Sequence, residues 1–246
     1  MQLDTRTEGY DQIRDVVLEV VPDTETEPLL VRARDHVRAW NGRADADQVG
    51  FRIVQLYYRA LTERALAPLL APAVAVDPNF VYRWPLADEP LRRLLDERPE
   101  NLLTRDFADW PAFLRAVLLD ALRELERDPA RPGIDARWGD VNVIDVAHPL
   151  AGLPVIGDLL GPWLRLPRDT VPGATLALRV ATPSYGALIR MSVSPAHPEN
   201  GILEMSGGES GHFLSPHFAD LQADWVNGAA TPFLAGPAVS RMVLEP

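Results

Sequence analysis

The chain has 246 residues, of which 47% are hydrophobic, and this is enough to bury a sizeable core in one large domain or two small ones. Its formal net charge is −11 and its Arg residues alternate with Asp and Glu, so the composition excludes a nucleic-acid-binding surface. It has no Cys, which excludes disulfides, thiolate catalysis and zinc–thiolate sites.

Apolar residues at helical spacing predict two amphipathic helices, over residues 13–20 and 29–40, and Asn41-Gly42 ends the second. A third and longer helix is predicted to begin near Asp47. It is expected to end near Pro68, because proline lacks an N–H and its ring clashes with the preceding turn.

Two further helices are predicted from their capping residues. Asp88 is expected to cap a short helix that carries Pro90 in its first turn. Asp109 is expected to cap the helix that follows it through Leu125, which has an apolar face and an opposite face rich in Arg and Glu.

Residues 128–172 are rich in proline, which predicts an ordered but irregular connection. The segment is too apolar for a disordered linker, and it includes Leu153, Leu159 and Trp163. We therefore expect another surface to pack on it.

After Pro172 the apolar period changes to two, which predicts strands at 176–180, 188–193, 202–205 and 239–244. One helix interrupts them. It is expected over residues 216–226, with Ser215 as its N-cap and Asn227-Gly228 as its end.

These elements predict an α+β fold in which a helical lobe precedes antiparallel strands. The helical lobe is expected over residues 1–130 and the irregular connection over 131–172. Residues 173–246 are expected to supply the strands and one helix. No apolar run approaches about eighteen residues and no signal-peptide pattern is visible, so neither a membrane span nor a membrane partner is expected.

The run Gly208-Glu209-Ser210-Gly211 resembles the approach to a nucleophile elbow, in which small residues flank a strained Ser. His212 stands where the second Gly is needed, and no His follows Asp220 or Asp224 to complete the expected order. A Gly-rich turn after a strand is the preferred interpretation.

Three histidines, His197, His212 and His217, with Asp220 nearby, raise the alternative of a metal site. Their spacing matches no recognised ligand pattern. Capping and turn hydrogen bonds are the preferred use of these side chains.

Other candidate residues have structural interpretations. Nothing in the sequence shows that any two of the carboxylates Glu124, Glu126, Asp140 and Asp145 converge into an acid/base pair. The aromatic residues that follow helical periodicity are expected to anchor the core or an interface; they are Tyr57, Tyr58, Trp84, Trp110 and Trp225. No catalytic, cofactor-binding or metal residue is assigned.

Several runs together resemble the penicillin acylase family of N-terminal nucleophile hydrolases. The most specific piece lies between Met205 and Gly228 and includes Gly207-Gly208-Glu209-Ser210-Gly211-His212-Phe213-Leu214-Ser215-Pro216-His217-Phe218-Ala219-Asp220. The others are Met1-Gln2-Leu3-Asp4-Thr5, Trp40-Asn41-Gly42, Trp138-Gly139-Asp140, His148-Pro149-Leu150 and Pro172-Gly173. The chain differs from the family's usual pattern at Glu209, where Gln is common, and at Asp220-Leu221, where Asp-Gln is common.

The resemblance places this chain in the C-terminal part of the catalytic β-subunit, and it implies an αββα sandwich. In the family an N-terminal Ser, activated by its own α-amine, hydrolyses a linear amide through an acyl-enzyme. The nucleophile, the oxyanion-hole residues and the ligands of a structural calcium lie upstream, so none is carried onto this chain. The segment alone is expected to be inactive.

The resemblance also implies partners: the upstream acylase segment that carries the Ser, the α-subunit and a small amide substrate. The substrate is left open between a β-lactam side-chain amide and an N-acyl-homoserine lactone. The family suggests a periplasmic or secreted location. The alternative function is a non-catalytic interaction module that keeps the fold of this part of the acylase.

Overall fold

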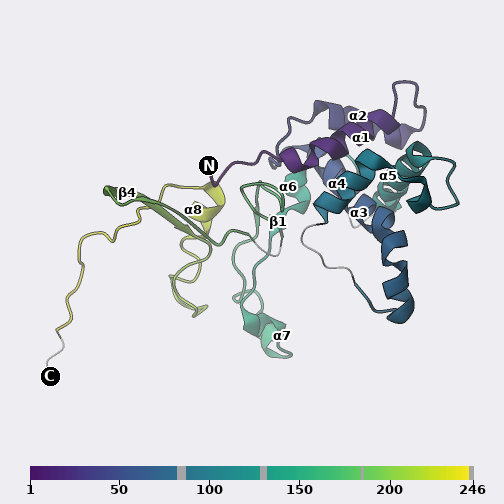
Figure 1. Ribbon diagram of the computed structural model, residues 1–246. Helices are drawn as coiled ribbons and strands as arrows, with labels where there is room; N and C mark the ends of the chain where they lie inside the picture. The colour runs from purple at the N-terminus through teal and green to yellow at the C-terminus, as the bar shows by residue number, and fades with distance from the viewer. Residues whose placement is uncertain (82–86, 128–131, 184–185, 244–246) are drawn as a thin grey trace. The chain divides into compact units, whose positions relative to one another are not determined.

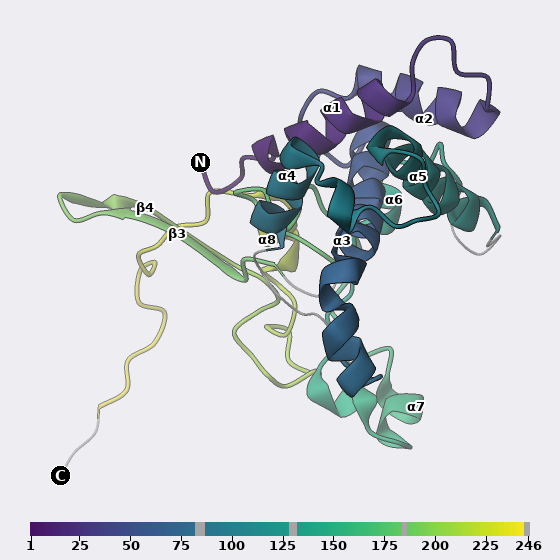
Figure 2. The same ribbon diagram turned by 45° about the vertical axis from the view of Figure 1, so that its right-hand side comes forward.

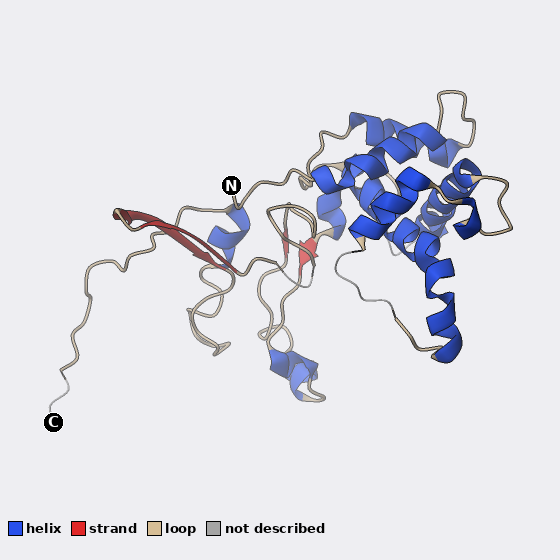
Figure 3. Cartoon of the chain, viewed as in Figure 1, coloured by secondary structure: helices blue, strands red, loops and turns tan. Residues whose placement is uncertain are grey.

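A computed structural model describes residues 1–81, 87–127, 132–183 and 186–243. In this described part the chain forms two compact units. The helical unit comprises residues 4–142 and 172–180, and the strand-containing unit comprises residues 1–3, 143–171 and 181–246. Helices dominate the first and the strands belong to the second (Figure 3).

The helical unit is organised around one long helix, α3, against which α1, α2, α4 and α5 pack. Its elements are η1 (Glu8–Tyr10), α1 (Asp11–Val20), α2 (Pro28–Ala39), α3 (Val49–Val76), α4 (Asp88–Glu97), η2 (Glu100–Leu102), α5 (Trp110–Arg127) and α6 (Trp138–Val141). The predictions of helices at 13–20 and 29–40 are confirmed by α1 and α2. Their apolar faces enter the core, with Val17 and Leu30 fully buried.

The predicted end of the third helix near Pro68 is wrong, because α3 continues through Pro68 and Pro72 to Val76. The Ala and Leu residues around these prolines favour helix, and the carbonyls left without a donor can bond to water. In Figures 1 and 2 this end of α3 extends beyond the other helices of its unit, and Leu69, Val74 and Val76 are exposed on it.

One of the two predicted caps is confirmed. The Ala112 backbone N–H donates to the Asp109 carboxylate at 2.8 Å, which caps α5. The other is wrong: Asp88 is the first residue of α4, and Ala87 occupies the N-cap position without a side-chain hydrogen bond. Asp88 therefore acts as an acid in the first turn.

The strand-containing unit is built from short elements. They are β1 (Val143–Ile144), η3 (Pro149–Gly152), α7 (Ile156–Leu160), β2 (Asp169–Thr170), β3 (Ile189–Ser194), β4 (His197–Met205) and α8 (Gln222–Asn227). Among the described residues β1 pairs with β2 and β3 with β4, both antiparallel, and Arg190 lies opposite Glu204. The predictions of strands at 188–193 and 202–205 are confirmed by β3 and β4.

Three other predictions for the residues after Pro172 are corrected. Residues 176–180 form turns and bends, and residues 239–243 have no regular structure, while Leu244 lies outside the described residues. The helix expected from Pro216 begins only at Gln222, because residues 212–221 form successive turns. Ser215 caps one of those turns: its Oγ accepts from the His217 N–H at 3.1 Å.

Burial differs greatly between the units. The helical unit has a large core that includes Tyr57 and Trp110, with Tyr58 partly buried against it. Among the described residues of the other unit, Ile144, Val171, Ala181 and Trp225 form a small buried cluster, and Leu164 is buried apart from it. These positions confirm the structural interpretation of the aromatic residues, apart from Trp84, which lies outside the described residues.

The Pro-rich connection is ordered in its described part, and it divides between the two units after Asn142. It contains α6, η3 and α7, so it is less irregular than expected. Leu153, Val155, Leu159 and Trp163 are exposed on it. Helices and antiparallel strands together confirm the α+β class, while the three-segment organisation stays a prediction.

Candidate functional site

The run that carries the most specific part of the resemblance forms a closed loop between β4 and α8. Gly207 begins the loop with a φ of +79°, a conformation that favours glycine. The Leu221 N–H donates to the Gly207 carbonyl at 2.9 Å, and the Gln222 Oε1 accepts from the Gly207 N–H at 2.9 Å. Gln222 therefore supplies an amide next to the position where the family commonly has Gln.

The two halves of this loop touch at Gly208. The Ser210 N–H donates to the His217 carbonyl at 3.0 Å. A Cβ at Gly208 would lie 2.1 Å from that same carbonyl oxygen and 2.6 Å from the Asp220 Oδ1. The loop can close in this way because residue 208 has no side chain.

Ser210 has a turn-forming role. Its Oγ accepts a hydrogen bond from the His212 backbone N–H at 3.1 Å. Among the hydrogen bonds of the described residues, no His side chain contacts this hydroxyl, so the arrangement lacks the base that a nucleophilic Ser needs. The geometry supports the interpretation of this run as a Gly-rich turn.

The three candidate histidines make separate local contacts. The His217 Nδ1 lies 2.8 Å from the Asp220 Oδ2, and the His197 Nδ1 lies 3.2 Å from the Glu199 Oε1. The His212 Nδ1 accepts from the Leu214 N–H at 3.2 Å. Within the described ranges, no group of three or more His, Asp or Glu side chains could hold a metal ion.

The four candidate carboxylates are not brought together as an acid/base pair. Glu126 accepts a hydrogen bond from the Ile134 backbone N–H at 2.7 Å. Asp145 forms an ion pair with Arg165 at 2.8 Å. Glu124 lines a groove between α3 and α5. Asp140 accepts from the Arg137 N–H at 2.8 Å. Hydrogen bonds from Arg137 lower the pKa of Asp140.

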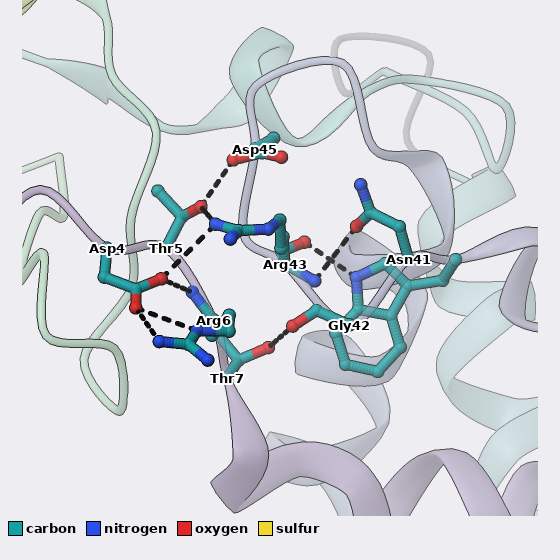
Figure 4. Close-up of polar contacts among 9 residues, drawn as sticks. Asp4, Thr5, Arg6, Thr7, Asn41, Gly42, Arg43 and Asp45 are labelled. Atoms are coloured by element: carbon teal, nitrogen blue, oxygen red, sulfur yellow. Dashed lines mark hydrogen bonds and ion pairs between the residues drawn. The ribbon is translucent and has the colours of Figure 1, made fainter.

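A polar network that sequence reasoning missed joins residues 4–7 to residues 41–45 (Figure 4). The Asp4 carboxylate accepts hydrogen bonds from the Arg6 side-chain Nε at 2.8 Å and from the Arg6 backbone N–H at 3.1 Å. The Arg43 Nη1 lies 3.3 Å from the Asp4 Oδ1. The Thr5 hydroxyl donates to Asp45 at 2.5 Å. The Asp4-Thr5 and Asn41-Gly42 runs of the resemblance thus meet in space, which no periodicity in the sequence indicates.

Backbone bonds complete this contact. The Thr7 N–H donates to the Gly42 carbonyl at 3.1 Å, and the Ala44 N–H donates to the Thr5 carbonyl at 2.8 Å. Gly42 has a φ of +77°, so the turn that presents its carbonyl favours glycine. The network fixes the start of the helical unit against the loop between α2 and α3, and its chemistry is that of a structural contact.

The sequence profile of the penicillin amidase family matches residues 1–240. The chain belongs to the penicillin amidase family. It is 29% identical over 243 residues to the penicillin acylase 2 proenzyme of Pseudomonas sp. (strain SE83), a match that covers 87% of this chain. The chain spans 28% of the length of that relative.

Membership of the penicillin amidase family confirms the resemblance and places the chain in a family of amide hydrolases. Within the ranges that the structure describes, no helix combines the length and the apolar character needed to cross a bilayer. The most specific family run forms a tightly bonded loop, closed by the hydrogen bonds of Gly207 and Ser210.

The closed loop of this penicillin amidase segment gives a stability prediction. Gly208→Ala is expected to destabilise the strand-containing unit by about 1–3 kcal/mol, because the added methyl group overlaps the His217 carbonyl. Gly211→Ala is the matched control, since a Cβ there meets nothing within 4 Å. Urea unfolding of both variants checks the difference, and equal midpoints would contradict the loop geometry.

The Asp4 network gives a pH prediction. Hydrogen bonds from the Arg6 side chain and backbone lower the pKa of Asp4 from 3.8 to about 2. Because the pKa of Asp4 is lower in the folded state than in the unfolded state, the charged carboxylate stabilises the fold at pH values above the unfolded-state pKa. This stabilisation is lost as the pH falls toward 2. Asp4→Asn is therefore expected to lower the urea midpoint at pH 7, and the difference from the unaltered chain should shrink below about pH 4. A difference independent of pH would exclude the Asp4 charge as its cause.

Proposed function

We propose that this chain is the C-terminal portion of the catalytic β-subunit of a penicillin acylase-like amidohydrolase. The observation that carries the proposal is the match of the penicillin amidase family over residues 1–240. The remaining polypeptide would carry the N-terminal Ser and the α-subunit, consistent with the relative being named a proenzyme. This chain's strands would then form part of an αββα sandwich.

Features of the strand-containing unit support a missing partner. Its described apolar cluster of Ile144, Val171, Ala181 and Trp225 is small, whereas Leu153, Val155, Leu159 and Trp163 are exposed. The β3–β4 pair is a two-stranded ribbon, and such ribbons are marginally stable without further strands or a covering layer. An additional polypeptide that covers this unit would supply the buried area that it lacks.

The reaction that we propose is hydrolysis of a linear amide. The Ser hydroxyl attacks the acyl carbonyl and its proton passes through water to the α-amine. The C–N bond of the substrate then breaks as that proton is delivered to the leaving nitrogen, which releases the product amine and forms the acyl-enzyme. Water then releases the acid, and the oxyanion is stabilised by donors outside this chain. The β-lactam side-chain amide and the N-acyl-homoserine lactone are the two substrate classes to compare.

The test combines this chain with the remaining polypeptide of the Pseudomonas proenzyme, outside the region that the chain matches. Light scattering measures the complex, and amide hydrolysis is assayed with a penicillin and with an N-acyl-homoserine lactone. We expect a one-to-one complex that hydrolyses at least one of them. A folded monomer that ignores the partner would contradict the proposal and favour a non-catalytic interaction module.

Ser210→Ala is expected to leave this activity unchanged, and the chain alone is expected to be inactive. The Ser210 hydroxyl accepts a hydrogen bond within its own turn and has no His partner among the described residues. Measurement of kcat and KM for the complex with and without the substitution checks this. Activity abolished by Ser210→Ala in a folded variant would make Ser210 the nucleophile and overturn the assignment.

A further inference from the structure

The β3–β4 ribbon has two edges, and the hydrogen-bond pattern shows which backbone groups face each of them. The Ser206 N–H donates to the Leu188 carbonyl at 2.9 Å. Hydrogen-bonded pairs alternate along an antiparallel ladder, so the backbone groups of Arg190 face β4. Those of Ile189 and Met191 therefore face away from β4.

The outer edge of β4 is already covered by the chain's own residues 229–233. The Leu203 N–H donates to the Thr231 carbonyl at 3.0 Å, and the Phe233 N–H donates to the Gly201 carbonyl at 2.9 Å. These bonds agree with the alternation inferred for β3. Further pairing is therefore blocked at Gly201–Leu203 of this edge.

The outer edge of β3 is not covered in the same way. Within the described residues, its one hydrogen bond comes from the Gln2 side chain, whose Nε2 donates to the Met191 carbonyl at 3.2 Å. Met1–Leu3 also line a shallow depression of about 370 Å³ over the face of the ribbon that carries Arg190 and Glu204. The start of the chain thus lies beside β3 without pairing with it through its backbone.

The side chains of β3 also divide into a covered and an uncovered face. The Arg190 guanidinium is buried and lies 5.1 Å from the Trp225 ring. The neighbouring Ile189 and Met191 point to the opposite face, and both are more than half exposed. An apolar face beside unpaired backbone groups is the surface that an added strand covers.

We infer that the outer edge of β3 receives an extended strand from the upstream acylase polypeptide, which continues the sheet past Ile189 and Met191. This inference rests on the proposed function. Under that function the polypeptide ahead of residue 1 enters near the outer edge of β3, where the Gln2 side chain donates to the Met191 carbonyl. The net charge of −11 disfavours a second copy of this chain as the occupant, because like charges repel.

The experiment measures amide hydrogen exchange at single residues in the chain alone and in complex with the remaining Pseudomonas proenzyme polypeptide. We expect the Ile189 and Met191 amides to exchange at least tenfold more slowly in the complex. The Arg190 amide, which already faces β4, is the internal control. Unchanged exchange at Ile189 and Met191 in a complex that forms would overturn the inference and leave the proposed function standing.

Variants at the edge give a second test. Met191→Pro removes an N–H that does not face β4, and it is expected to weaken complex formation at least tenfold. Met191→Ala, which keeps the N–H, should weaken it less. Equal affinities for the two folded variants would overturn the inference.

A dimer of the chain alone that Met191→Pro abolishes would identify a second copy as the occupant and also overturn it. A chain that forms no complex would contradict the proposed function, and the inference with it.

Discussion

Phe51→Ala is expected to destabilise the helical unit by about 3–5 kcal/mol, because it empties the centre of an aromatic cluster. Phe51 is fully buried on α3. Its ring packs edge-on against Tyr10 at 5.3 Å and Trp138 at 5.0 Å between ring centroids, and it lies 5.7 Å from Trp40. Truncation would leave a cavity among three aromatic rings, which close it poorly because they are rigid.

Urea unfolding followed by circular dichroism measures this effect. The matched control is Leu69→Ala on the same helix, where the side chain is about half exposed. We expect that control to change the unfolding free energy by less than about 0.5 kcal/mol. Equal effects at the two positions would show that the aromatic cluster does not organise this core.

Glu204→Leu is expected to destabilise the strand-containing unit by about 3–5 kcal/mol, because it leaves a buried cation without its partner. Arg190 and Glu204 lie opposite each other on β3 and β4, with side chains 5% and 7% exposed and 2.7 Å between Nη2 and Oε2. The guanidinium also donates to the Trp225 carbonyl. Burial lowers the pKa of Arg190, although the charge of Glu204 acts in the opposite direction.

The double variant Arg190→Met/Glu204→Leu separates the cost of an unpaired charge from the loss of packing. We expect its stability to return to within about 1 kcal/mol of the unaltered chain, since apolar residues of similar size often replace a buried ion pair without loss. Tryptophan fluorescence during urea unfolding checks both variants. The single variant Arg190→Met completes the cycle. A double variant whose loss of stability equals the sum of the losses of the two single variants would contradict a coupled pair.

Local rules predicted the helices well and the strand-containing unit less well. The periodicity of α1, α2 and α5 reflects one apolar face on a shared core, so it is visible in the sequence. The passage of α3 through Pro68 is not visible, because surrounding residues outweigh the local cost of proline. Residues 176–180 alternate like a strand, yet Leu176 and Ala177 pack on the helical core from a turn.

Short-range patterns in the sequence predicted the roles of some candidate residues but not the contacts between distant ones. The sequence predicted that Ser210 and the nearby histidines form turn or capping hydrogen bonds, and Ser210 and His212 do accept from backbone N–H groups two residues on. The Asp4–Arg43 contact was not predicted, since it joins residues 39 apart in sequence. The Arg190–Glu204 pair was not predicted either. Charged residues in a strand are usually exposed, and only the register of β3 and β4 shows that these two lie opposite each other.

The sequence alone determined the α+β class, the helices of the first lobe, the β3–β4 strands and the resemblance to the penicillin amidase family. These features depend on short-range periodicity, capping and motif spacing, which one chain displays directly. The tertiary structure decided which charges are buried, which loop halves touch and which strand edge is left open. Such features depend on contacts between distant residues, where burial changes the energetics of a charge or an unpaired backbone group by several kcal/mol.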